Sequence, residues 1–398
     1  MALTGVAGCG SSDSDDSADD GSSTVPTALA SYFPGTKASG TAVKVGLVSD
    51  EGGGAVSNSN YNDAGEAAAK YANDELGGLA GHPIEIVRCG TKSDATGATA
   101  CANQMVEEKV AVVVSTANGF GDTIVPIVTG AGIPYVSASG NSAAEQTSDG
   151  TYMWGGGFAA TLKGFAEYAK SEGWKSVTVF PVDVPAAAGA VKAVGDPFFE
   201  AAGVELNITA IPAGVADATP QVTEGLAGDP DGLAVVNSET GCTTTLKAIT
   251  VVAPDIPTMV NASCLNSGTA EALGSAFDGV KVMTNSSTST DDEESALYRQ
   301  VMEKYAPKAD ATGFTVTGYQ SVLGLVRAVT LGGLSGDVTS DAIKAAITAA
   351  KDVPMPAATG ITFTCDGTAL PALPSDCTAA GLLLTVKDGK GTDPQVVE

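Results

Sequence analysis

AVVVSTANGFGDTIVPIVTGAGIPYVSASGN, residues 111–141, is the stretch that decides the fold. It opens with a short apolar run, continues as a helical pattern that two glycines end, and closes with a second apolar run. This order predicts a strand–helix–strand unit with parallel strands buried on both faces. Each strand is followed by small polar residues, and the candidates are Ser115, Thr116 and Asn118 after the first and Ser137, Ser139, Gly140 and Asn141 after the second.

These two polar loops are the first candidate functional feature. In open α/β sheets, ligands bind outside the carboxyl ends of the strands. Helix N-termini beside such loops offer free N–H groups that suit a carboxylate. Two solvated turns would give the same local pattern, so a single unit leaves both interpretations open.

The composition indicates a globular chain of two domains. It has 398 residues, 43% of them hydrophobic and 17% charged, which is more than one hydrophobic core usually serves. The formal net charge of −26 argues against nucleic acid or an anionic membrane surface as a partner. The sequence has no apolar run of about eighteen residues, the length that a membrane-spanning helix needs.

The beginning of the chain predicts a tether, residues 1–40, rather than a folded part. Val6-Ala7-Gly8-Cys9 resembles a bacterial lipobox, in which small residues precede a cysteine that receives lipid. The acidic residues 10–24 are too hydrophilic to fold. A full signal peptide would add a basic region and a longer apolar stretch, so we expect a truncated or mis-started sequence. The alternative is a disordered tail with one chance cysteine.

The cysteines favour export from the cytoplasm. Six remain once Cys9 is set aside for lipid, and proximity along the chain suggests the disulfides Cys89–Cys101, Cys242–Cys264 and Cys365–Cys377. Six cysteines allow fifteen connectivities, so other pairings stay open. Disulfides are typical of extracytoplasmic proteins. Because the chain has no C-x-x-C and only one histidine, in a Gly-His-Pro turn, we predict no metal site.

Strand-like and helix-like segments alternate along most of the chain. A first series begins at residues 43–48, a glycine-rich pause follows at residues 150–157 (GTYMWGGG), and a second series continues to residues 280–283. Such alternation predicts doubly wound parallel sheets. We therefore predict an α/β protein with two doubly wound, Rossmann-like lobes.

An ordered series of segments resembles a known family. None is specific alone, but together they cover nearly the whole chain from residue 43 onward: VKVGLV (43–48), DAGEAAAKYAND with GGLAGHPIEIV (63–87), VVVSTANGFGDTIVPIVTGAGIPYVSASG (112–140), ALYRQVMEKYAP (296–307) and TGYQSVLGLVRAV (317–329). The series is similar to the type I periplasmic binding proteins, in the branch that serves ABC transporters of branched-chain amino acids (leucine, isoleucine and valine).

The resemblance implies two lobes joined by three crossovers, which close on a ligand by hinge motion. It divides the chain into lobe one, residues 41–155 and 286–354, and lobe two, residues 156–285 and 355–398. The expected crossovers lie near residues 155–157, 283–289 and 353–360.

The resemblance also implies a division of labour in the site. In amino-acid binders of this family, hydroxyl and N–H groups of lobe one hold the α-carboxylate, a role that Ser115, Thr116, Asn118, Ser139 and Asn141 fit. Lobe two usually brings a carboxylate for the ammonium group, with aromatic residues. The matching positions here read Asn261-Ala262 for the acid and Ala186 and Thr240 for the aromatics, so Glu239 or Asp183 would substitute, beside Ser238 and Asn261.

These features lead to one functional hypothesis and two alternatives. The first is a solute-binding protein that delivers a small polar ligand, an amino acid or a small carboxylate or amide, to an ABC permease. We expect this protein to be a monomer, lipid-anchored at the outer face of a bacterial cell membrane, and to need no cofactor. No lysine or arginine lies in the expected cleft loops, which argues against polyanions. The second is a ligand-sensing module that docks on a membrane receptor or kinase. An enzyme is third, because G-x-S-x-G, H-E-x-x-H, Walker A and Rossmann glycine motifs are absent from the sequence.

Overall fold

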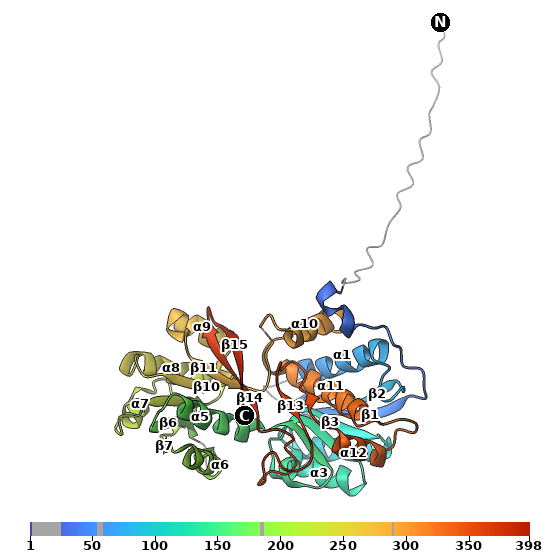
Figure 1. The fold of residues 1–398 in the computed structure, drawn as a ribbon, viewed down its shortest axis with the longest axis horizontal. Helices are drawn as coiled ribbons and strands as arrows, with labels where there is room; N and C mark the ends of the chain where they lie inside the picture. Colours follow the sequence, from blue (N-terminus) through green and yellow to red (C-terminus); the bar gives the residue numbers. More distant parts are fainter. Residues whose placement is uncertain (2–24, 54–58, 184–186, 289) are drawn as a thin grey trace.

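The computed structural model describes residue 1 and residues 25–53, 59–183, 187–288 and 290–398. Figure 1 shows two α/β lobes, each built on a twisted sheet with helices on its faces. The predicted lipidation site, Cys9, and Ala186 lie outside the described residues.

The first lobe is built on a sheet of five parallel strands. Their order across the sheet is β2 (Ile84–Gly90), β1 (Val43–Ser49), β3 (Val112–Ala117), β4 (Tyr135–Ser139) and β5 (Thr151–Gly155). The helices of this lobe are η1 (Thr27–Tyr32), α1 (Ser59–Glu75), α2 (Ala95–Glu107), α3 (Gly121–Gly130), α4 (Ala143–Thr147), α10 (Glu293–Tyr305), η4 (Gly313–Thr315), α11 (Val316–Leu331) and α12 (Ser340–Ala349).

Two helices pack closely over one face of this sheet. Helix α11 is almost entirely buried, as its apolar sequence predicts, and α1 presents a face of alanines. A side chain at Gly318 would meet the carbonyl oxygen of Tyr61 at 1.8 Å, so glycine is what lets α11 approach α1. On its other side α11 holds β5, because the indole N–H of Trp154 donates to the carbonyl of Ser321 at 3.1 Å. This packing sets the position of the β4 and β5 ends, where the predicted polar loops begin.

The second lobe is built on a sheet of eight strands, of which one, β14, is antiparallel to the rest. Along the sheet lie β15 (Lys390–Val397), β14 (Gly381–Lys387), β11 (Lys281–Thr284), β10 (Thr258–Asn261), β9 (Gly232–Val236), β6 (Ser176–Asp183) and β7 (Glu205–Ile208), while β8 (Ile211–Pro212) pairs with β6. The helices are α5 (Gly157–Ser171), α6 (Ala187–Ala202), α7 (Thr219–Gly225), α8 (Glu239–Val252), η2 (Ala262–Cys264), α9 (Ser267–Leu273) and η3 (Gly274–Phe277). The prediction of two doubly wound lobes is confirmed.

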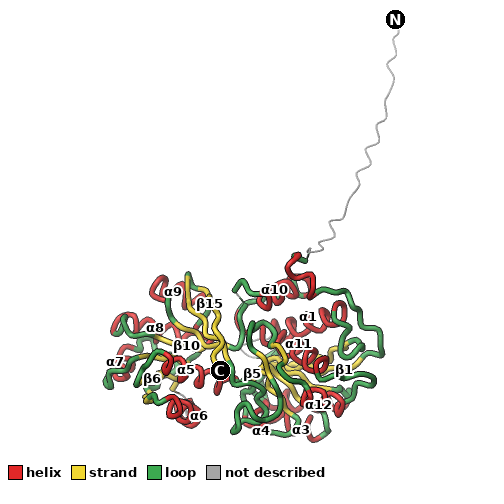
Figure 2. The backbone as a smooth tube through the Cα atoms, in the orientation of Figure 1, coloured by secondary structure: helices red, strands yellow, loops and turns green. Residues whose placement is uncertain are grey.

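The described chain passes between the two sheets at three places. Two agree with the expected crossovers, because residues 155–157 join β5 to α5 and the second passage follows β11. The third does not. It lies at residues 378–381, just before β14, and not at residues 353–360. Figure 2 shows the strands of the two sheets meeting near this region, on either side of the connecting loops.

Residues 353–378 lie on lobe one, where residues 375–377 follow β5, whereas the prediction placed residues 355–398 with lobe two. The backbone N–H of Cys377 donates to Met153 of β5 at 2.8 Å, and the ring of Phe363 stacks on Trp154 at 4.9 Å. The short strands β12 (Val353–Pro354) and β13 (Thr362–Phe363) pair here. The predicted lobe boundary at residue 355 was wrong. The segment lies along β5 through a few irregular backbone hydrogen bonds, and such contacts leave no periodic pattern in the sequence.

The three disulfides have the pairing suggested by proximity. Cys89–Cys101 joins β2 to α2, Cys242–Cys264 joins α8 to η2, and Cys365–Cys377 closes the loop that lies along β5. Among the helices of the described residues, none has the length and apolar character needed to cross a membrane.

Candidate ligand-binding cleft between the two sheets

Two adjoining hollows lie between the lobes, and Ala262, Thr284 and Phe314 line both of them. The larger holds about 230 Å³ of open space and the smaller about 100 Å³, which suits a small molecule. Lobe one contributes the β4 end with Ser139 and Asn141. Gly313 and Phe314, on η4, also come from lobe one. The remaining lining comes from the crossovers and lobe two: Gly157, Phe158, Ala160, Thr161, Val236, Glu239, Asn261, Ser263, Leu265, Asn266, Val282, Met283, Asn285, Ser286, Thr288, Ala380, Gly381 and Leu384.

The two loops nearest the first crossover touch each other. Gly157 has a φ of +50°, and a side chain there would lie 3.4 Å from the carbonyl oxygen of Gly140 and 3.6 Å from Cβ of Ser139. The positive φ makes glycine suited to the position, and a side chain there would only reach ordinary van der Waals contact with the β4 loop. Because α5 begins at this residue, the first turn of a lobe-two helix is held next to the β4 end of lobe one.

Five of the seven predicted lobe-one residues do not line the hollows, and three of them, Ser115, Thr116 and Asn118, form a separate buried group. The Nδ2 group of Asn118 donates to Ser115 at 2.6 Å and to the hydroxyl of Tyr135 at 2.8 Å, and its Oδ1 accepts the N–H of Phe120 at 2.8 Å. Thr116 donates to Oδ1 of Asn62 at 2.9 Å. All three are buried, and their polar groups are paired within lobe one. In this arrangement the three side chains are therefore not exposed to a ligand, and the direct contact with a ligand carboxylate that the resemblance implies is not available to them.

The network around Asn118 ends at a buried glutamate, Glu145. The Tyr135 hydroxyl donates to Oε1 of Glu145 at 2.6 Å, while Oε2 accepts the N–H of Asn141 at 2.9 Å and the hydroxyl of Ser142 at 3.0 Å. Burial, followed by the charge of Glu145, raises the pKa of Tyr135 well above its usual value. Burial also raises the pKa of Glu145, although the hydrogen bonds that it accepts from Tyr135, Asn141 and Ser142 lower it in part. Glu145 thus holds the cleft loop 139–142 in place.

Sequence reasoning missed Glu145, although a signal for it exists. Ser142 and Glu145 have the Ser-x-x-Glu spacing of a capping box, and the Ser142 hydroxyl accepts the N–H of Glu145 at 3.3 Å, as in that motif. The other two predicted residues of this region, Ser137 and Gly140, line neither hollow. Ser137 is buried and accepts the N–H of Ser139 at 3.4 Å, and Gly140 packs so closely on Gln146 that a side chain would meet it at 2.8 Å.

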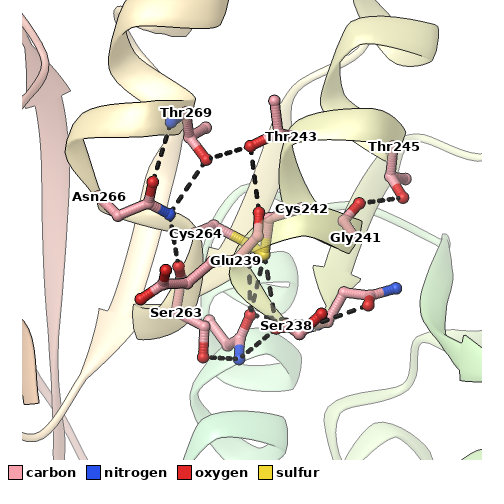
Figure 3. Close-up of a disulfide and its surroundings, with 12 residues drawn as sticks. Ser238, Glu239, Gly241, Cys242, Thr243, Thr245, Ser263, Cys264, Asn266 and Thr269 are labelled. Atoms are coloured by element: carbon pink, nitrogen blue, oxygen red, sulfur yellow. Dashed lines mark hydrogen bonds between the residues drawn. A yellow bond between two sulfur atoms is a disulfide. The ribbon is translucent and has the colours of Figure 1, made fainter. Parts of the chain in front are cut away.

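On the lobe-two face of the cleft, hydrogen bonds and a disulfide join a cluster of residues, drawn in Figure 3. Glu239 is the first residue of α8, and its carbonyl accepts the hydroxyl of Thr243 at 3.1 Å. The Thr243 and Thr269 hydroxyls share a hydrogen bond of 2.7 Å, and Asn266 donates to Thr269 at 3.1 Å and to the carbonyl of Ser263 at 2.8 Å. The Cys242–Cys264 disulfide joins the same two turns, so the loops that carry Glu239 and Ser263 are held together.

The remaining predicted lobe-two residues differ in how they meet the cleft. Asn261 lines it and donates to the Ser263 hydroxyl at 3.2 Å. Ser238 is exposed at the N-cap of α8, and its N–H donates to Asn237 at 2.9 Å. Asp183 is exposed at the end of β6 and does not line either hollow, and the expected loop beyond it, residues 184–186, lies outside the described residues.

Three aromatic residues at or near the cleft were not foreseen. Phe158, in the first turn of α5, lines the larger hollow. Phe314, on η4, is 42% exposed and lines both hollows. Tyr61, in the first turn of α1, has a pKa raised by burial and then by the negative charge of Glu239, so it lies within electrostatic reach of that residue across the lobes. The family pattern placed aromatics at Ala186 and Thr240 of lobe two, whereas Phe314 and Tyr61 come from lobe one, and nothing in the sequence signals that these two approach the cleft.

The electrostatics of the cleft follow from its lining. Glu239 is the one charged residue among the described residues that line the two hollows, and no hydrogen bond or ion pair joins its carboxylate to another described side chain. The rest of the polar lining is hydroxyl and amide, which can both donate and accept hydrogen bonds. In the described part of the chain, no group of three or more His, Cys, Asp or Glu residues is placed to hold a metal ion.

Comparison with known proteins agrees with this geometry. The profile of the family described as periplasmic binding protein matches residues 42–374, so the chain belongs to that family. Within it, the solved structures that the chain is similar to include branched-chain amino-acid-binding members of ABC transporters. One is LivJ of Streptococcus pneumoniae in complex with isoleucine, which is 17% identical, with 90% of this chain and 99% of that chain covered and a TM-score of 0.69.

Two further solved structures show the same fold. An ABC transporter substrate-binding protein from Sphaerobacter thermophilus is 16% identical over 90% of this chain and 97% of its own, with a TM-score of 0.73. A solute-binding protein of an ABC transporter from Rhodopseudomonas palustris, in complex with p-hydroxybenzoic acid, is 19% identical over the same shares, with a TM-score of 0.69. No curated protein matches the sequence.

Proposed function

We propose that this chain is the extracytoplasmic solute-binding protein of an ABC importer, which captures a small polar ligand between its lobes and delivers it to the permease. The observation that carries the proposal is the cleft itself. It lies where the carboxyl ends of two sheets face each other, and hydroxyl and amide groups line it from both sides. Three crossovers connect the lobes, so a ligand that bridges them stabilises the closed form.

The lining favours a ligand with a polar acceptor at one end. The Ser139 hydroxyl and the Asn141 amide can donate hydrogen bonds to a ligand from lobe one's side of the cleft, where a carboxylate or amide oxygen fits. Any cationic end faces Glu239, with Phe314 beside it for apolar or cation–π contact. The relatives in complex with isoleucine and with p-hydroxybenzoic acid support amino acids and small carboxylates as the classes to test first.

Attachment to the membrane completes the proposal. The lipobox-like residues 6–9 would place a lipid on Cys9, and the acidic, serine-rich stretch after it would serve as a flexible tether to the outer face of the membrane. The partner would then be an ABC permease in the same membrane, with the binding protein acting as a monomer.

A thermal-shift screen of amino acids, small carboxylates, amides and aromatic acids tests the function. A compound present at 100 times its dissociation constant adds about 2.7 kcal/mol to the free energy of unfolding. The same screen with Glu239→Gln reports the ligand class. A hit that carries an ammonium group loses most of its shift in this variant, whereas a neutral or anionic hit keeps it, because only the first needs the carboxylate.

A blocked cleft provides the control. Ala262 lines both hollows, so Ala262→Trp fills them, whereas Ala227→Trp adds the same side chain at an exposed turn of lobe two. We expect hits to stabilise wild type and Ala227→Trp alike and to leave Ala262→Trp unshifted. A hit that stabilises Ala262→Trp as much as wild type binds elsewhere, and the proposed cleft is then not the site.

A further inference from the structure

The carboxyl group of Asp376 is an unusual feature of lobe one. The residue is 1% exposed, and neither carboxyl oxygen has a hydrogen-bond partner among the described residues. Leaving a carboxylate buried without a donor or a cation is costly, so such a group is expected to be protonated or to share its surroundings with another titratable group.

The titratable group that acts on Asp376 is Glu145. Burial raises the pKa of Asp376 to about 7, and the negative charge of Glu145 adds to the effect. The other charged or titratable side chains on the surrounding elements are Asp122 on α3, Tyr135 on β4, Asp149 before β5, Tyr152 on β5, and Asp366 on the same loop, which pairs with Lys351 at 3.2 Å. No lysine or arginine on the described parts of these elements compensates the two buried acids.

The two acids are not equivalent, and this decides where a shared proton resides. Glu145 accepts hydrogen bonds from Tyr135, Asn141 and Ser142, all of which favour its charged form. Asp376 accepts none. A proton is therefore held more favourably on Asp376 than on Glu145.

Asp376 also lies at the base of the hinge. It belongs to the Cys365–Cys377 loop, which attaches to β5 through the Ser375 carbonyl and the Cys377 N–H, both bonded to Met153 at 2.8 Å. The Ser375 hydroxyl adds a bond of 2.7 Å to Thr151. The third crossover, residues 378–381, begins immediately after the loop, and its last two residues line the cleft.

We propose that Asp376 and Glu145 form a proton-binding site that fastens the Cys365–Cys377 loop to β5, and that loss of this proton releases the loop and loosens the third crossover. Without the proton, lobe one holds two buried negative charges with no lysine or arginine on the surrounding described elements to compensate them, and the structure relieves this by letting the loop move toward water. Glu145 also accepts hydrogen bonds from the cleft loop 139–142. The same protonation step therefore affects both the third crossover and this cleft loop. The inference concerns the ligand-free protein and does not depend on which solute is bound.

Amide hydrogen exchange of the ligand-free protein between pH 5.5 and 8.5, corrected for intrinsic rates, tests the proposal. In wild type, exchange in residues 371–378 is expected to accelerate by up to roughly tenfold for each pH unit above the midpoint, as one-proton linkage requires. Asp376→Asn keeps the shape of the side chain without the charge, so its exchange rate is expected to stay flat. Asp366→Asn, on the same disulfide loop but exposed, is the matched control and is expected to follow wild type.

A second measurement keeps the proposal testable if Asp376→Asn does not fold. Carbon-13 NMR of aspartate-labelled wild type and Asp366→Asn should show one carboxyl group that titrates near neutral pH. The proposal is overturned if every aspartate titrates below about pH 5. It is equally overturned if loop exchange in wild type has no pH dependence after correction, or if Asp376→Asn retains the wild-type pH profile.

Discussion

Ser115 and Ser139 have similar positions in the sequence but different surroundings in the structure. Both are serines that follow a parallel strand, and the sequence treats them alike. In the structure Ser115 accepts from Asn118 in a buried network, while Ser139 lines the cleft. The difference comes from Tyr135 and Glu145, which lie 20 and 30 positions further along the chain from Ser115 and recruit its loop into the core. Polar residue type and strand end were predictable, but the direction of each side chain was not.

A pair of alanine substitutions separates the two roles. Ser139→Ala removes a donor to a charged or polar end of the ligand and is expected to weaken binding by about 1.5–3 kcal/mol, roughly ten- to a hundredfold in Kd. Ser115→Ala is expected to leave Kd within about twofold but to lower the free energy of unfolding by about 1–3 kcal/mol, because it leaves the Asn118 amide short of a partner. Calorimetry with a ligand from the screen and urea unfolding measure the two effects. Equal losses of affinity in both variants would mean that Ser115 reaches the ligand after all.

At the scale of elements, what was predictable followed from regular patterns. Strands such as β3 and β4, the apolar helix α11 and the disulfides between nearby cysteines all leave local signals in the sequence. The segment 353–378 left none, since its strands have two residues each and its contacts with β5 are irregular. That segment carries Asp376 and moves the third crossover, so the part of the hinge that sequence reasoning misplaced is also the part with the unusual chemistry.

The contact of α11 with β5 gives a prediction about stability. A side chain at Gly324 would meet the indole nitrogen of Trp154 at 2.6 Å, inside a buried layer that also holds Phe363. Gly324→Ala is therefore expected to lower the free energy of unfolding by about 1–3 kcal/mol through overpacking. Gly189→Ala, in a helix with open space around the glycine, should instead raise it by about 0.5–1 kcal/mol. Urea unfolding compares them, and a stabilised Gly324→Ala would show that α11 does not pack on Trp154 as described.

At the scale of the whole molecule, each lobe has a sheet of its own, and the chain passes between them repeatedly. This arrangement lets the lobes rotate as bodies while the crossovers bend. The proposed cleft residues, Ser139 and Asn141 on one side and Glu239 and Asn261 on the other, belong to different lobes, so a ligand that contacts all of them bridges the lobes. Fold family and two-lobe organisation were predictable from the order of segments. The ligand was not, because the cleft combines loops from distant parts of the chain.

Small-angle X-ray scattering with and without a ligand from the thermal-shift screen tests this account most directly. Ligand that bridges the lobes is expected to reduce the radius of gyration of wild type, because closure brings two separate bodies together. Ala262→Trp, measured in the same way, should show no change. Superimposable wild-type profiles at saturating ligand would contradict the account, since a solute bound between the lobes cannot then be what closes them.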